Sequence, residues 1–212
     1  MSANRTQSFL SILQWVNCPV VYLNARNLRQ WQHPEHPFHP AFDFLSATHK
    51  SDYLRGYLMH HYGGGYTDIK PTHKDWSPFF SALRATDKLA LGYTEIGPEG
   101  VAPVGGELEQ QLRAEYRRLV GLCAFIFRRR SVLTAQWYAA TAALLDAKLD
   151  LLRQNPATHP QEFQGVRFDD GSVSAYPVAW TELLGNIFHP LVWRHRDSIL
   201  HADIAPRFEN YR

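Results

Sequence analysis

The sequence predicts an α/β sandwich, in which a central mixed sheet is flanked by helices, and three observations support this expectation. Helix-like and strand-like segments alternate through most of the 212 residues. Hydrophobic residues make up 45% and charged residues 20% of the chain, a balance that is ordinary for globular proteins. The length is most simply that of one domain, so we expect residues 1–212 to form a single unit.

The first part of the chain predicts helix, then strand, then loop. Apolar residues at helical spacing predict a helix over residues 7–16, and Pro19 ends it before the strand-like run VVYLN at 20–24. The segment HPEHPFHP at 33–40 has three interleaved prolines, which predict an irregular loop.

The middle of the chain continues the alternation. Ser51 is a plausible N-cap for a helix that runs to Tyr62, and Gly63–Gly65 end it before the short strand YTDI at 66–69. Further elements are predicted in the order strand 88–95, helix 107–119, strand 122–127, helix 131–153 and helix 180–187.

Charge, cysteines and hydropathy exclude several classes of protein. A net charge of +2 is too small to indicate nucleic-acid binding by itself. Cys18 and Cys123 form no metal-binding or disulfide pattern, which favours a reducing compartment. The apolar stretch near the N-terminus is interrupted by polar residues, so we interpret it as core and not as a signal peptide. No run is long enough to span a bilayer. We therefore expect a cytoplasmic protein whose membrane contact, if any, is peripheral and at the inner face.

The glycine cluster beside a strand first suggests a phosphate-binding loop. In such loops the strand precedes the glycines, whereas here the helix does, so Gly63–Gly65 more simply cap the helix and turn the chain. Asp68 and Lys70 are two residues apart, so on a strand they share one face, and Pro71 places them at its end. Asp68 could hold a divalent cation on a substrate phosphate, and Lys70 could contact that phosphate directly. The alternative is an ordinary surface ion pair.

The segment SDYLRGYLMHHYGGGYTDI, residues 51–69, resembles the SD-x-x-R…Y-G-G-x-Y/W-x-D region of bacterial capsular-polysaccharide-type glycosyltransferases, relatives of sugar-transferring proteins with a DxD motif. The residues at the family's spacing are Ser51, Asp52, Arg55, Tyr62, Gly63, Gly64, Tyr66 and Asp68. Weaker matches, in the family's order, are VVYLNARNLRQW at 20–31 and AYPVAWTELLGNIFHPL at 175–191. The resemblance covers residues 8–200.

This resemblance implies a GT-A fold, a Rossmann-type sandwich, and transfer of a hexosyl group from a nucleotide-sugar donor to a glycan or lipid-linked acceptor in surface polysaccharide synthesis. It implies that Asp52 and Arg55 lie near the nucleoside and its diphosphate, with Ser51 and Tyr66 among the substrate-binding residues. Asp68 is implied as a catalytic residue and as the carboxylate on the metal side, with Mn²⁺ or Mg²⁺ as the cation. From the residues alone, the Asp52/Arg55 pair at helical spacing equally suits a structural salt bridge.

Two departures from the family pattern matter for function. Lys70 stands where the second acid of the DxD motif is expected, which puts metal dependence in question and makes Lys70 a candidate substrate-binding residue. The family's first strand, whose loop contacts the nucleotide base, has no counterpart. We therefore expect either that Met1 is a late start or that the nucleotide pocket is incomplete. These departures motivate the alternative of a non-catalytic nucleotide-sugar or glycan-binding protein.

Polar residues outside this segment provide further candidates. Glu182 and His189 in the C-terminal block are candidates for acceptor binding or for taking the acceptor's proton. The arginines at 128–130, with Arg117 and Arg118, could face an anionic lipid surface, although a solvated face is the usual explanation of such a run.

Three histidines, His33, His36 and His39, are spaced three apart in the proline-rich loop, and this spacing suggests a metal site. The prolines prevent a helix, so the spacing alone defines no ligand geometry. We therefore interpret this segment as a solvated loop.

Overall fold

The computed structural model describes residues 2–209, and these form an α/β sandwich. The helices are α1 Ala3–Trp15, α2 Ala47–His61, α3 Ser77–Arg84, α4 Gly106–Ala114, α5 Val132–Gln154 and α6 Gly185–Arg194. The strands are β1 Gly64–Thr67, β2 Ala90–Thr94, β3 Val120–Phe127 and β4 Ile199–His201. The predicted fold class is therefore confirmed.

The four strands form one mixed sheet in the order β1-β3-β2-β4. Strand β3 pairs antiparallel with both β1 and β2, and β2 pairs parallel with β4. In the register of the first pair, Tyr66 lies opposite Phe125. β1 is thus an edge strand, and the residues that follow it leave the sheet at its border.

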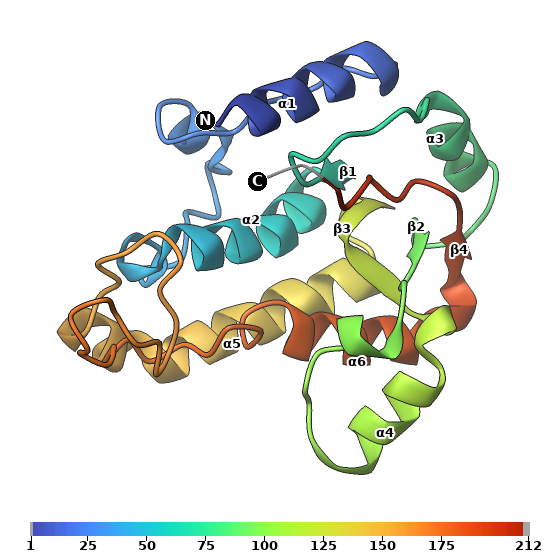
Figure 1. The fold of residues 1–212 in the computed structure, drawn as a ribbon. Helices are drawn as coiled ribbons and strands as arrows, with labels where there is room; N and C mark the ends of the chain where they lie inside the picture. Colours follow the sequence, from blue (N-terminus) through green and yellow to red (C-terminus); the bar gives the residue numbers. More distant parts are fainter. Residues whose placement is uncertain (1, 210–212) are drawn as a thin grey trace.

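The alternation of side chains along β3 explains why helices cover both faces of the sheet. Phe125 and Phe127 are buried on one face with Trp137 of α5, and α6 joins the same cluster. Ala124 and Ile126 point to the other face and pack with side chains of α1 and α3. Figure 1 shows α5 and α6 on one side of the sheet and α1 on the opposite side. None of the described helices is long and apolar enough to span a bilayer.

The start of α2 differs from the prediction. The helix begins at Ala47, and its N-cap is Ser46, whose side chain accepts a hydrogen bond from the His49 amide at 3.3 Å. Ser51 lies within the helix, so its prediction as the N-cap was wrong. The earlier serine provides the same capping chemistry, and the residues between it and Ser51 extend the helix.

The strand predicted at 20–24 does not form. The Asn27 side chain donates to the Tyr22 carbonyl at 2.8 Å and accepts from the Asn24 amide at 2.9 Å. These side-chain bonds occupy backbone groups that a neighbouring strand would otherwise pair, so residues 20–24 stay irregular and lead into a turn at 25–27 despite their β-branched residues.

The C-terminal helix is also displaced from its predicted position. A helix was predicted over 180–187, whereas hydrogen-bonded turns occupy residues 180–184 and α6 begins at Gly185. Helix α3 and strand β4 were not predicted at all. Both are short, and such elements depend on packing rather than on a long periodic pattern.

Candidate functional site

The turn between α2 and β1 brings together the two parts of the segment 51–69, the helix that carries Asp52 and Arg55 and the strand end that carries Asp68. The Gly63 amide donates to the Leu58 carbonyl at 3.1 Å, and Gly63 and Gly64 have φ angles of +68° and +90°. A Cβ atom on Gly63 would lie 2.7 Å from the Arg129 backbone nitrogen. Gly63 therefore ends the helix and the chain reverses there, as predicted, but the strand begins at Gly64 and ends at Thr67 instead of covering 66–69.

The end of β1 places Asp68 and Lys70 side by side, although not as two residues of one strand. The Asp68 amide donates to the Cys123 carbonyl at 2.8 Å, which extends the pairing with β3 one residue beyond Thr67. The Lys70 amide then donates to the Asp68 carbonyl at 2.8 Å. This tight turn brings the Lys70 ammonium to 2.5 Å from Oδ2 of Asp68.

The residues Asp52, Arg55, Tyr66, Asp68 and Lys70 form one connected group, which we call the Asp68 network. Arg55 lies 3.7 Å from Asp52 and 3.4 Å from Asp68. Its guanidinium group lies over the Tyr66 ring, 4.6 Å from the centroid. The Tyr66 hydroxyl donates to Oδ1 of Asp68 at 2.6 Å. The structure thus brings together five of the predicted site residues.

Ser51 adjoins this network because its side chain lowers the pKa of Tyr66, against the larger rise that burial causes. Arg55 is further fixed by a hydrogen bond of 3.0 Å to the Leu122 carbonyl of β3. The network is therefore anchored to α2, to β1 and to β3. Its members have little freedom to move independently.

Burial and neighbouring charge act in opposite directions on the two carboxyl groups. Burial raises the pKa of Asp68, but Arg55 and Lys70 outweigh it, so the net pKa lies below its usual range. Burial raises the pKa of Asp52 to about 6, because Arg55 only partly compensates for it and the Asp68 charge adds to the shift. Asp68 is therefore ionised at neutral pH, and the Asp68 charge raises the pKa of Lys70 against the effect of burial.

The Asp68 network does not fit a resident Mn²⁺ or Mg²⁺ ion. Tyr66 and Arg55 approach Oδ1 of Asp68, and Lys70 approaches Oδ2. A hard divalent cation needs free carboxylate oxygens, and here it would also lie beside two positive side chains. The Lys70 ammonium lies where such a cation would have to contact Oδ2 of Asp68.

Glu182 and His189 are held away from this network by other partners. Glu182 forms an ion pair with Lys148 at 2.8 Å and accepts from the Ala179 amide at 2.8 Å. His189 is fully buried, and its Nδ1 accepts from the Ala102 amide at 3.0 Å. Both residues thus have structural partners, and their roles in acceptor chemistry stay predictions.

The arginine run is divided between structural and surface positions. Arg128 donates to the carbonyl groups of Leu83, Thr86 and Lys88, and so it joins α3 and β2 to the end of β3. Arg118 pairs with Asp197 at 2.8 Å on the surface. Arg128 therefore has a local structural role instead of facing a lipid surface.

The proline-rich loop is not helical, as predicted, but its histidines are not simply solvated. His39 lies apart, with Nε2 3.0 Å from Asp146. His33 and His36 instead meet His61, the last residue of α2. Sequence spacing within the loop could not identify His61, which comes from another element.

A hollow in the surface lies beside the irregular segment between α5 and α6. It is lined mainly by the segment 159–168 and by Trp180, and no residue of the Asp68 network borders it. The hollow is therefore separate from the predicted site.

Comparison of the chain with protein-family models, with curated proteins and with solved structures gave no match.

Proposed function

We propose that this protein transfers a sugar from a nucleotide-sugar donor to a glycan or lipid-linked acceptor, as an enzyme of GT-A type. The observation that carries the proposal is the convergence of Asp52, Arg55, Tyr66 and Asp68 at the end of β1. The resemblance implied these residues from sequence spacing alone. A cytoplasmic location and a role in surface polysaccharide synthesis remain parts of the same proposal.

In the proposed mechanism Lys70 replaces the metal ion. Departure of the nucleoside diphosphate builds negative charge, and a preorganised ammonium group stabilises that charge. Asp68 orients the ammonium group, to which it is bonded at 2.5 Å, while Arg55 fixes Asp68 from the other side. Phe208 lies over the ammonium, 5.2 Å from ring centroid to Nζ, so this side chain must move before a diphosphate can bind there.

A non-catalytic nucleotide-sugar or glycan-binding protein is the second candidate. The observation that favours it is that both oxygens of Asp68 already have partners within the protein. A carboxylate in this condition positions its neighbours but is not free to take a proton from an acceptor. The two candidates share the donor site and differ in turnover.

Thermal unfolding in the presence of UDP-, GDP-, CMP- and dTDP-sugars, each with Mn²⁺ or with EDTA, tests the shared donor site. We expect one class of donor to raise the melting temperature equally in both conditions, because Lys70 stands in for the cation. Donor consumption with an acceptor mixture then distinguishes the enzyme from the binding protein. If no nucleotide sugar binds, both candidates fail.

The charge of Lys70 is tested against that of Lys74, a nearby lysine paired with Asp203 on the surface. We expect Lys70→Ala to weaken donor binding in EDTA by about 10- to 100-fold, the range for losing a charged hydrogen bond. Lys74→Ala removes the same charge and should leave binding nearly unchanged. Equal donor affinity in Lys70→Ala and wild type would reject the role of Lys70 as a metal substitute.

A further inference from the structure

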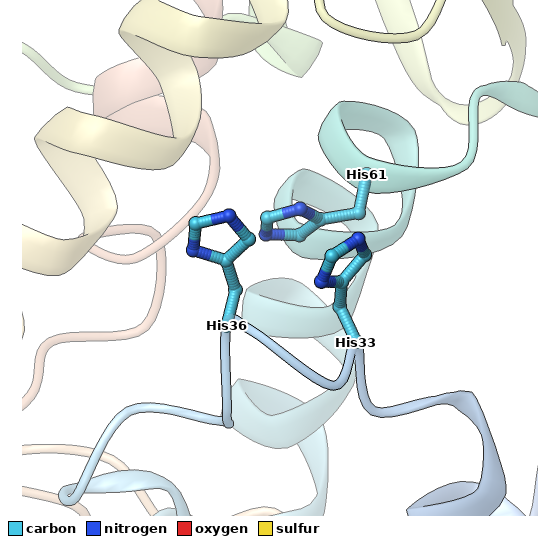
Figure 2. A group of neighbouring side chains, drawn as sticks. All are labelled: His33, His36 and His61. Carbon is cyan, nitrogen blue, oxygen red and sulfur yellow. The ribbon is translucent and has the colours of Figure 1, made fainter.

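Three histidine rings from two separate elements meet at the end of α2. The ring centroids of His33, His36 and His61 lie 4.9 to 5.1 Å apart. One nitrogen of each ring can be chosen so that all three lie within 4.8 Å of one another. Figure 2 shows His33 and His36 rising from the loop toward the helix end that carries His61. We call this group the histidine cluster.

Tyr57 holds the loop that carries two of these histidines against α2. Its hydroxyl accepts from the His33 amide at 2.6 Å and donates to the His36 carbonyl at 2.5 Å. The backbones of His33 and His36 also pair with each other, with an amide-to-carbonyl distance of 3.1 Å. Tyr57 lies one helical turn before His61. The fold therefore fixes both loop histidines next to the helical one.

Not every ring nitrogen of the cluster has a hydrogen-bond partner among the described residues. His61 is buried, and its Nε2 has no hydrogen-bond partner among residues 2–209. In a neutral imidazole one ring nitrogen carries a lone pair, so Nε2 of His61 can bind a metal when the ring proton is on Nδ1. In His39, by contrast, Nδ1 accepts from the Ala41 amide and Nε2 bonds Asp146. The cluster therefore has a ring nitrogen without a hydrogen bond, whereas both ring nitrogens of His39 have partners.

We propose that His33, His36 and His61 bind one Zn²⁺ ion, with water at an open fourth position. Neutral imidazoles suit zinc and other late transition metals, whereas Mg²⁺ and Ca²⁺ prefer oxygen ligands. A buried, unpartnered nitrogen is costly, and coordination would satisfy it. His36 is exposed, so the open position faces solvent. This site is independent of the proposed sugar transfer.

Formation of the site requires a small contraction of the loop. Tetrahedral coordination at Zn–N distances of 2.0–2.1 Å places the ligand nitrogens about 3.3 Å apart. The exposed His36 can close this gap with little disturbance of the core. Nδ1 of His33 accepts from the Glu35 amide at 3.2 Å. Metal binding removes this contact, either because Nδ1 itself binds the ion or because the ring proton moves to Nδ1 to free Nε2. The charge of Arg130, which acts on His61, opposes cation binding and limits the affinity.

Calorimetric titration of metal-stripped, untagged protein with Zn²⁺ tests the proposal, since a histidine tag would itself bind zinc. We expect one Zn²⁺ per chain, a rise in melting temperature with Zn²⁺, and no such rise with Mg²⁺. Substitution of Co²⁺ should give the visible absorption of a tetrahedral site. Absence of saturable 1:1 binding would overturn the proposal.

Two single substitutions distinguish this site from adventitious binding to the other histidines. His36→Gln removes an exposed ligand and should weaken Zn²⁺ binding by about 100-fold or more, because loss of outer-shell partners already costs 10- to 100-fold. His39→Gln, the matched control in the same loop, should bind Zn²⁺ as wild type does. Equal affinity of His36→Gln and wild type would refute the assignment. Melting curves recorded without metal verify that both variants are folded.

Tyr57→Phe tests whether the hydrogen bonds of the Tyr57 hydroxyl to the loop position the two loop ligands. The ring is kept, but both hydrogen bonds of its hydroxyl are lost. We expect about tenfold weaker Zn²⁺ binding with the tetrahedral Co²⁺ spectrum retained, which is the pattern of a lost outer-shell contact. Unchanged affinity would show that Tyr57 does not position the ligands.

Discussion

The Asp68 network and the histidine cluster are both built on α2, but they differ in how their polar atoms are satisfied. In the Asp68 network, one carboxylate has Tyr66, Arg55 and Lys70 as partners within 3.4 Å. In the histidine cluster, three rings face one another, and the buried Nε2 of His61 has no partner in the described part of the chain. The oxygens of Asp68 are thus occupied by side chains of the protein itself, whereas the histidine cluster keeps a ring nitrogen that could bind a metal.

This difference teaches where a metal can bind in this protein. The acid that the sequence suggested as a metal ligand is neutralised internally by Lys70, whereas a loop interpreted as solvated contributes two histidines to the proposed zinc site. Residue type alone is therefore a poor guide to a ligand. The number of free lone pairs, which depends on the neighbours, decides whether a side chain can coordinate an ion.

The largest expected effect comes from neutralising Asp68. Asp68→Asn leaves Arg55 and Lys70 partly buried without their shared counter-charge, and we expect a loss of about 3 kcal/mol in the free energy of unfolding. Urea unfolding followed by circular dichroism measures it. Asp203→Asn, at an exposed pair with Lys74, should change stability by less than about 0.5 kcal/mol. A loss below about 1 kcal/mol for Asp68→Asn would show that the network contributes little to stability.

Asp68→Asn also separates the two regions. If they are independent, the folded variant should bind Zn²⁺ as tightly as wild type, and the proposed function predicts weaker donor binding. A parallel loss of Zn²⁺ affinity would indicate that α2 couples the two sites.

A smaller effect is expected at the turn that joins the regions. Gly63→Ala places a Cβ atom 2.7 Å from the Arg129 backbone nitrogen at a φ of +68°. We expect a destabilisation of about 2–3 kcal/mol and weaker binding at both sites, because the turn fixes the end of α2 and the start of β1. Gly64 has a φ of +90°, but an added methyl group would meet open space there, so Gly64→Ala should cost only about 1 kcal/mol. Equal losses in the two variants would exclude the steric contact as the cause.

The contribution of the Tyr57 hydroxyl, which bonds the backbones of His33 and His36, can be measured without metal. Tyr57→Phe should lower the free energy of unfolding by about 1–2 kcal/mol, because two backbone groups of the loop lose their partner. Chemical denaturation in EDTA measures this loss, and backbone hydrogen exchange at His33 localises it. Unaltered exchange at His33 would contradict the role of Tyr57 as a clamp.

The smallest effect concerns the pH dependence contributed by Asp52. Its pKa is about 6 when folded, against 3.8 for an unperturbed group, so the folded state binds the proton more tightly. Stability from this group is therefore lost as the pH rises from about 4 to about 6. Asp52→Asn removes that loss, and we expect its stability relative to wild type to improve by on the order of 1 kcal/mol between pH 4.5 and 7.5. The exposed control Asp150→Asn should show no such trend, and a trend of opposite sign for Asp52→Asn would disprove the assignment.

Much of the Asp68 network could be predicted from the sequence because its geometry is local. Asp52 and Arg55 are one helical turn apart, and glycines with positive φ reverse the chain so that Asp68 returns beside them. The proximity of Asp68 and Lys70 was predicted correctly, although a tight turn and not a regular strand produces it. The saturation of Asp68 could not be predicted, because it depends on side-chain positions.

The sequence by itself determined the α/β class, the long helices and the helix–glycine–strand unit, because periodicity, capping and backbone conformation act over a few residues. Only the tertiary structure decided that 20–24 leaves the sheet and that His61 meets two histidines from a loop more than twenty residues earlier. The reason is physical: contacts between distant segments depend on how whole elements pack, here through the Tyr57 hydroxyl, and spacing along the chain does not encode that packing.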